Sequence, residues 1–187
     1  MELKFKMTAD GRSKTELSAE KEIVRRYFHE VLDQGKMEIV EEIFHPQCVM
    51  HRPGGTVVGI ESIRGVAARR KETFSQFETQ IHDIFGSGDR LVVRLSHCGI
   101  GDGVWRSRLG NYDVTGKTVT WNAIAIFRFE RQKIIEEWVT RDELAMILQF
   151  GLLEPAAVNK RLIRCSGDRR VAPTPRERRS PWDRYLV

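Results

Sequence analysis

The chain of 187 residues is long enough to bury one substantial hydrophobic core, and its 41% hydrophobic content is typical of a globular domain rather than a disordered one. No apolar run approaches the length of a membrane span, and the N-terminus lacks the continuous apolar region of a secretory signal. We therefore expect a cytoplasmic protein. Cys48, Cys98 and Cys165 are widely spaced and form no CxxC pair, so neither a disulfide framework nor a zinc site is predicted.

The net charge of +5 is concentrated at the C-terminus. From Glu154 onward there are nine Lys or Arg against four Asp or Glu, whereas residues 1–153 hold 22 of each sign. A neutral folded part argues against nucleic-acid binding, because that function needs a basic surface. We expect residues 1–17 to be a flexible leader. Residues 154–187 predict a flexible basic tail, rich in Pro and Arg, with at most a weak acidic partner.

The first half of the chain has the apolar spacing of helices. Residues 18–35 predict an amphipathic helix with Ser18 as its N-cap and Gly35 as its stop. A short second helix is expected over residues 37–44, before Pro46, followed by a strand over residues 48–52. A third helix comes next, and the residues spaced for its inward face are Ile60, Ile63, Ala67, Arg70 and Phe74.

In the second half of the chain, apolar and polar residues alternate instead, which is typical of strands. The expected strands are 78–85, 91–98, 104–109 and a hairpin from residue 118 to residue 140. Helices followed by antiparallel strands indicate an α+β fold. Thr140 and Glu143 form a capping-box pattern for a last helix, whose Leu144, Ile147 and Leu148 are expected to pack on the sheet. The core is expected to end near Leu153.

The hairpin contains an unusual carboxylate. Its first strand places Trp121, Ala123, Ala125 and Phe127 on one face. After a turn at residues 131–132, the second strand is expected to place Ile135, Glu137 and Val139 on a common face. Glu137 would then be flanked by apolar side chains.

Three segments resemble the SnoaL-like polyketide cyclase family, within the nuclear transport factor 2-like superfamily. Residues 22–51, EIVRRYFHEVLDQGKMEIVEEIFHPQCVMH, are similar to the family's helix, Gly turn, short helix, "HP" and strand with a terminal His. Residues 126–138, IFRFERQKIIEEW, resemble its hairpin, and residues 142–151, DELAMILQFG, resemble its closing helix. The resemblance covers residues 18–153.

The resemblance implies a cone, in which N-terminal helices pack in a curved antiparallel sheet that is closed by a C-terminal helix. It also implies a mainly apolar pocket for a hydrophobic small molecule, a homodimer, and no cofactor or metal. The residues expected to contact substrate are Trp121, Phe127, Ala123, Ala125, Val139, Arg94 and Trp105. The ring-closing members use an Asp as acid/base at the position of Val139, and an aliphatic side chain cannot exchange a proton.

Glu137 and His51 are the candidate catalytic residues. Burial of Glu137 would raise its pKa, as acid/base work near neutral pH requires, but a carboxylate paired with Arg94 or Arg128 is an equally good interpretation. His51 matches the family's pocket His, and the alternative is a rim histidine bonded to backbone. Arg94 and His97 lie on opposite faces of one strand, so only one can line the pocket, and the alternative role expected for Arg94 is that of a structural ion-pair partner. Asp142 is interpreted as a helix-capping acid.

Two classes of function remain open for the folded part, and a third hypothesis is that the basic tail binds nucleic acid or an acidic partner. The first is a cofactor-independent cyclase or isomerase of a polyketide-like or terpenoid-like intermediate, with an epoxide hydrolase as a variant that would need an Asp, Arg, Asp set. The second is a non-catalytic small-molecule-binding or scaffold protein, which Val139, Ala123 and Ala125 favour.

Overall fold

A computed structural model describes residues 14–107 and 110–153. The expected basic tail and residues 1–13 of the expected leader lie outside these ranges. Residues 14–17, also assigned to the leader, instead open the first helix, so the helix begins before Ser18, which is not its N-cap.

Helices precede most of the strands, as expected for an α+β fold. The helical elements are α1 (Lys14–Arg26), a π-helical segment (Tyr27–Asp33), a 3₁₀ turn (Met37–Ile39), α2 (Val40–Ile43), α3 (Ile60–Thr73) and α4 (Glu143–Gln149). The strands are β1 (Phe44–Arg52), β2 (Gly55–Val58), β3 (Phe74–Ser87), β4 (Arg90–Gly101), β5 (Val104–Ser107), β6 (Gly110–Asp113), β7 (Thr118–Glu130) and β8 (Lys133–Arg141). The short strands β2 and β6 were not predicted.

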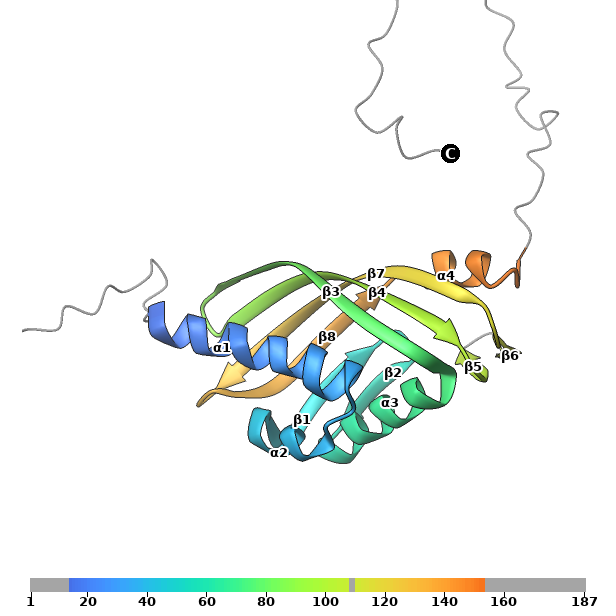
Figure 1. Ribbon diagram of the computed structural model, residues 1–187. Coiled ribbons are helices and arrows are strands. Elements are labelled where there is room, and N and C mark those ends of the chain that lie inside the picture. Colours follow the sequence, from blue (N-terminus) through green and yellow to red (C-terminus); the bar gives the residue numbers. More distant parts are fainter. Residues whose placement is uncertain (1–13, 108–109, 154–187) are drawn as a thin grey trace, which may run out of the picture. The chain divides into compact units, whose positions relative to one another are not determined.

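The main sheet has the strand order β2-β1-β8-β7-β4-β3, and β5 pairs with β6 separately. All neighbours are antiparallel except β1 and β8, which run parallel. Helices α1, α2 and α3 lie on one side of this curved sheet, and α4 follows the end of β8 and lies beside the first part of β7 (Figure 1). The side facing α1 to α3 is called the inner face below, and the opposite side the outer face.

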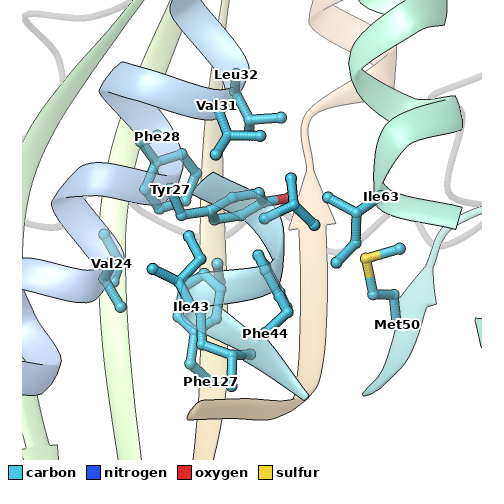
Figure 2. Packing of buried hydrophobic residues seen from close by; sticks show 14 of the residues in the cluster. Val24, Tyr27, Phe28, Val31, Leu32, Ile43, Phe44, Met50, Ile63 and Phe127 are labelled. Carbon is cyan, nitrogen blue, oxygen red and sulfur yellow. The ribbon is translucent and has the colours of Figure 1, made fainter. Parts of the chain in front are cut away.

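The core fills the space between the inner face and the helices. Tyr27, Phe28, Val31 and Leu32 from the π-helical segment are all buried, and Figure 2 shows Tyr27 packed among Phe28, Ile43 and Phe44. A second cluster around the opposite end of the sheet contains Phe74, Trp105, Val114, Val119, Trp121, Met146, Ile147 and Phe150. Burial of large apolar side chains of this kind contributes about 1.5–3 kcal/mol each.

The hairpin between β7 and β8 turns where the sequence predicts. Arg131 and Gln132 both have positive φ, 50° and 61°, which a type I′ turn requires. A register shift between Arg128 and Phe129 then opposes Phe129 to Ile134 but Arg128 to Glu136. This bulge adds one residue to β8, so Ile134 rather than Ile135 is buried in the core cluster. The expectation that Ile135 shares a face with Glu137 and Val139 is therefore wrong.

The C-terminal helix begins later than the capping box predicts. Strand β8 continues through Thr140 to Arg141, so Asp142 is the N-cap, and its side chain accepts a hydrogen bond from the Ala145 N–H at 2.9 Å. Asp142 is thus a capping acid, as expected. The inward face is formed by Met146, Ile147 and Phe150, while the expected core residues Leu144 and Leu148 are 59% and 41% exposed.

No helix in the described ranges combines the length and the apolar character that crossing a bilayer requires.

Candidate functional site

Two adjoining pockets lie at the inner face of the sheet. The inner pocket has a volume of about 20 Å³ and is lined by Tyr27, Phe28, Leu32, Arg52, Arg70, Leu95, His97, Trp121, Ala123, Ala125, Glu137, Val139 and Arg141. The mouth pocket, of about 310 Å³, shares Arg52, Arg70, Trp121 and Arg141 with it and adds Trp105, Phe74, Met146, Arg69 and Arg106, among others. Since a water needs roughly 10–15 Å³, the inner pocket has room for about one.

Glu137 is the only acidic residue among the described residues that line either pocket. It lies on β8 opposite Phe127 of β7 and Met50 of β1, and it is 1% exposed. Arg52, the last residue of β1, donates from Nη2 to Glu137 Oε2 at 2.6 Å and to the Tyr27 hydroxyl at 3.1 Å. The anticipated Arg partner of Glu137 therefore exists, but it is Arg52 rather than Arg94 or Arg128.

Burial dominates the ionisation of this cluster. It raises the pKa of Glu137 above its ordinary 4.5, although the positive charges of Arg52 and Arg70 oppose the rise. Burial likewise raises the pKa of Tyr27 to about 12, assisted by the charge of Glu137. A carboxyl group in this position can hold a proton at a pH where an exposed one cannot.

His97, on β4, is another titratable group of the inner pocket with a displaced pKa. Burial, together with the charges of Arg70, Arg141 and Arg52, holds its pKa well below the ordinary 6.5, so the ring is neutral. Thr79 Oγ1 donates to Asp33 Oδ1 at 2.6 Å and lies 2.9 Å from His97 Nδ1. Because the Thr79 hydroxyl has one proton and gives it to Asp33, Nδ1–H of His97 is the donor to Thr79, and Nε2 is the unprotonated nitrogen.

Arginines surround the boundary between the two pockets. Arg70 of α3 is half-buried, lies with its guanidinium carbon 3.9 Å from the centre of the Phe77 ring, and has a buried Nη1 with no hydrogen-bond partner among the described residues. Burial lowers the pKa of Arg70 to about 10, and the charges of Arg52 and Arg141 act in the same direction. Arg141 is bonded through Nη2 to Glu143 at 2.9 Å.

Most residues predicted to contact substrate are brought together. Trp121, Ala123, Ala125 and Val139 line the inner pocket with Glu137, and Trp121 and Trp105 form a wall of the mouth pocket. Phe127 is fully buried in the core against Tyr27 and Phe28, and it lines neither pocket.

His51 and Arg94 are not brought to the site, because their side chains belong to the outer face. His51 stacks on Trp138 with ring centres 5.3 Å apart, and its Nε2 lies 2.9 Å from Glu136 Oε1. Arg94 is exposed and bonded to Asp83 at 2.6 Å, so it is a structural ion-pair partner and does not line the pocket. Of the two residues on β4, His97 is the one that faces inward.

Sequence reasoning missed Arg52 and Arg141, and it did not assign Arg70 or His97 to the site. Arg70 had a signal: it occupies the apolar stripe of α3, where a lone cation is out of place. Arg52 and Arg141 each end a strand, and nothing in the alternation of β1 or β8 marks them as pocket residues. Among the described residues, no three His, Cys, Asp or Glu side chains are grouped so that they could hold a metal ion.

The chain belongs to the SnoaL-like polyketide cyclase family, whose model matches residues 22–150. Members of this family bind small-molecule substrates. No curated protein matches this sequence.

Solved structures share the nuclear transport factor 2-like fold of this family. A candidate SnoaL-like polyketide cyclase from Jannaschia sp. CCS1 is 25% identical, with a TM-score of 0.66, and the match covers 76% of this chain and 98% of that one. TsrD from Streptomyces laurentii is 21% identical, with a TM-score of 0.64 and coverages of 73% and 97%. An LEH-like epoxide hydrolase from M. tuberculosis is 13% identical, with a TM-score of 0.56 and coverages of 72% and 91%.

Proposed function

We propose that this protein is a cofactor-independent cyclase or isomerase that acts by general acid/base chemistry on a hydrophobic, polyketide-like or terpenoid-like intermediate in the cytoplasm. One observation carries the proposal: Glu137 and His97 line the same small pocket, and their environments displace their pKa values in opposite directions. A carboxyl group with a raised pKa can act as the acid at the same pH at which an imidazole with a lowered pKa acts as the base.

In the proposed reaction, the neutral His97 takes a proton from a carbon next to a carbonyl group, using Nε2. Protonated Glu137 gives its proton to the carbonyl oxygen, which yields an enol. The enol carbon then attacks a second carbonyl of the same molecule and forms the C–C bond of a ring, while the enol O–H proton returns to Glu137 and the protonated His97 gives its proton to the new alkoxide. In an isomerisation, a conjugated enol instead takes the proton of His97 at another carbon and returns its O–H proton to Glu137. The guanidinium groups of Arg52 and Arg70 stabilise the negative charge that develops on oxygen.

The pocket sizes define how a substrate would bind. The inner pocket accepts little more than a carbonyl group or a water, whereas the mouth pocket, of about 310 Å³, is at the lower end of the usual range of roughly 300–1,000 Å³ for ligand pockets. The body of the substrate would therefore lie against Trp105 and Trp121, with its reacting carbonyl directed past Arg70 toward Glu137.

The test is proton exchange at the α-carbons of 2-tetralone in D₂O, followed by NMR. We expect the wild type to accelerate exchange over buffer, and Glu137→Gln and His97→Gln to lose about 10²- to 10⁴-fold of that acceleration. The matched control is Glu136→Gln, which removes the neighbouring carboxylate from the outer face. A Glu137→Gln variant that folds and exchanges at the wild-type rate would remove Glu137 from the mechanism.

The second candidate is a binding protein of the same fold without catalysis. The 2.6 Å contact between Arg52 and Glu137 favours it, because such a pair can be purely structural. Binding of 2-tetralone without any acceleration of exchange would establish this alternative. The described residues that line the pockets include no aspartate, so the Asp, Arg, Asp set of an epoxide hydrolase is not assembled there.

We also propose a homodimer through the outer face of the sheet. Phe85, Val92, Ile126 and Trp138 oppose one another across β3, β4, β7 and β8, and Phe85 and Ile124 are 58% and 50% exposed. Exposed apolar side chains on one sheet face support a protein interface. Sedimentation equilibrium should give a dimer for the wild type and a monomer for Phe85→Ser/Ile124→Ser; a wild-type monomer refutes the proposal.

A further inference from the structure

The mouth pocket combines one apolar wall with an excess of positive charge. Trp105, Trp121, Phe74 and Met146 form the wall. Five arginines line the same pocket, and no acidic residue among the described ones does so: Arg52, Arg69, Arg70, Arg106 and Arg141. An ordinary apolar substrate would use the wall but leave these charges without a function.

Three of the five arginines have carboxylate partners. Arg52 is bonded to Glu137, Arg106 to Glu72 at 3.0 Å, and Arg141 to Glu143. Within the described ranges, Arg69 and Arg70 form no ion pair with a carboxylate. The charge of Asp33 favours the charged form of Arg70, but burial and the charges of Arg52 and Arg141 oppose it. Arg69 is exposed and can be compensated by solvent, whereas Arg70 is half-buried and cannot be compensated fully.

Arg70 is also short of hydrogen-bond acceptors. Its Nη1 is buried with no partner among the described residues, and the same holds for Nε of Arg52. An unsatisfied buried donor destabilises a protein by about 1–3 kcal/mol, and more when the group is charged. The contact of Arg70 with the Phe77 ring orients the guanidinium but provides no oxygen acceptor.

We propose that the mouth pocket binds a ligand with an aromatic or similarly flat apolar body and one carboxylate, which Arg70 receives at the boundary of the inner pocket. A carboxylate supplies two acceptor oxygens in the plane of a guanidinium, so it neutralises the charge of Arg70 and offers that guanidinium hydrogen-bond acceptors. The body of the ligand stacks on Trp105 and Trp121. This inference rests on the proposed function, since it specifies the substrate class of the same site.

The experiment compares 2-naphthoate with 2-naphthamide, which have the same ring body and differ in charge. Binding is measured by calorimetry on the full chain. We expect naphthoate to bind about 10- to 100-fold more tightly than naphthamide, the range that hydrogen bonds to a charged group provide. Equal affinities for the two compounds would overturn the proposal.

Arg70→Met tests the assigned residue, since it keeps the length of the side chain and removes its charge. We expect it to abolish the preference for naphthoate without weakening naphthamide binding. Arg94→Met, the same change on the outer face, is the control and should keep the preference. If both variants lose it equally, the effect is one of overall charge and the assignment to Arg70 is wrong.

A purely structural role for Arg70 predicts a different result in the absence of ligand. If Arg70 stabilises the fold, Arg70→Met should melt well below the wild type. If Arg70 is an anion-binding residue, the variant should melt at the same temperature or higher, because a buried charge without an ion-pair partner is removed. Should Arg70→Met fail to fold, the structural role is established and the proposal falls.

Arg141→Met, at the same boundary, should weaken naphthoate binding by a smaller factor than Arg70→Met does. Unchanged naphthoate binding would count against the boundary as the carboxylate site.

Glu137→Gln separates this inference from the catalytic proposal. It should bind naphthoate as tightly as the wild type, because Arg70 and not Glu137 receives the carboxylate, while α-proton exchange is lost. Exchange that depends on Glu137 without any preference for naphthoate would refute the anionic ligand and leave the acid/base mechanism standing.

Discussion

Glu136 and Glu137 are neighbours on β8, and each is bonded to an arginine, yet their pKa values move in opposite directions. Glu136 lies on the outer face, where a hydrogen bond with His51 and two with Arg128, at 2.9 and 2.7 Å, hold its pKa below the ordinary value. Glu137 lies on the inner face, where burial raises its pKa despite Arg52. Both carboxylates are bonded to an arginine, but Glu136 also has the hydrogen bond with His51 and is partly exposed, whereas burial dominates at Glu137.

This comparison explains why an ion pair alone does not define a functional carboxylate. On the outer face, water screens the charges, and the pair is a small electrostatic gain. On the inner face, loss of hydration disfavours the charged form more than one arginine restores it, so the carboxyl group remains able to exchange a proton. Four predictions test how far the two faces differ.

The largest effect should follow from leaving Glu137 without its partner. Arg52→Met removes the guanidinium from a buried pair and should lower the free energy of unfolding by about 3–5 kcal/mol. Arg128→Met removes the corresponding partner of the partly exposed Glu136, which keeps its hydrogen bond with His51, and should lower the free energy of unfolding by about 1 kcal/mol or less. Urea unfolding at pH 7 measures both; equal losses would show that the two faces do not differ.

The second effect is a rescue. Replacing both members of the inner pair, as Arg52→Met with Glu137→Leu, should recover most of the stability lost in Arg52→Met, because no buried charge remains unpaired. The same urea titration measures the recovery. A double variant that is as unstable as the single one would mean that Arg52 stabilises the fold through Tyr27 or packing rather than through Glu137.

A smaller effect is the dependence of stability on pH. Glu137 has a raised pKa in the folded state, so its contribution is fully present below the ordinary value of 4.5 and is lost as pH rises through the folded pKa. Glu136 has a lowered pKa, so its contribution is present above 4.5 and is lost as pH falls through the folded pKa. The stability difference between wild type and Glu137→Gln should therefore fall with rising pH, and that for Glu136→Gln should rise. Slopes of the same sign would contradict the comparison.

The smallest effect concerns His51. Since His51 lies on the outer face with Glu136, His51→Gln should change α-proton exchange by about twofold at most. It removes the hydrogen bonds of the ring with Glu136 and Thr56, each worth about 0.5–1.5 kcal/mol of stability. A loss of exchange comparable to that of Glu137→Gln would restore His51 as a catalytic residue. Exchange and unfolding measured on one preparation provide both numbers.

Alternation along β7 was sufficient to predict which residues face the pocket, because the period of a strand is fixed by its backbone. Trp121, Ala123 and Ala125 could be assigned for that reason. Alternation along β8 was less reliable, since the bulge after Arg128 moved Ile134 into the core. A bulge arises from the pairing of two strands, so the sequence of one strand alone does not predict it.

The helix boundaries show the same limit. Thr140 and Glu143 have the spacing of a capping box, but β8 continues past Thr140 because its backbone is paired with Ile124 of β7. The backbone of Thr140 is paired within the sheet, so the helix begins later and its N-cap is Asp142 instead of Thr140. The local pattern was valid, and a tertiary contact outweighed it.

The sequence by itself determined the α+β class, the family and the position of Glu137 among apolar side chains, because these follow from local periodicity and motifs. Only the tertiary structure decided which charged groups meet Glu137. Arg52, Arg70 and Arg141 come from β1, α3 and β8, and His97 comes from β4, so their convergence depends on how distant segments pack. Proximity in space and exclusion of water set the pKa values of such a cluster, and neither is a property of any one segment of the chain.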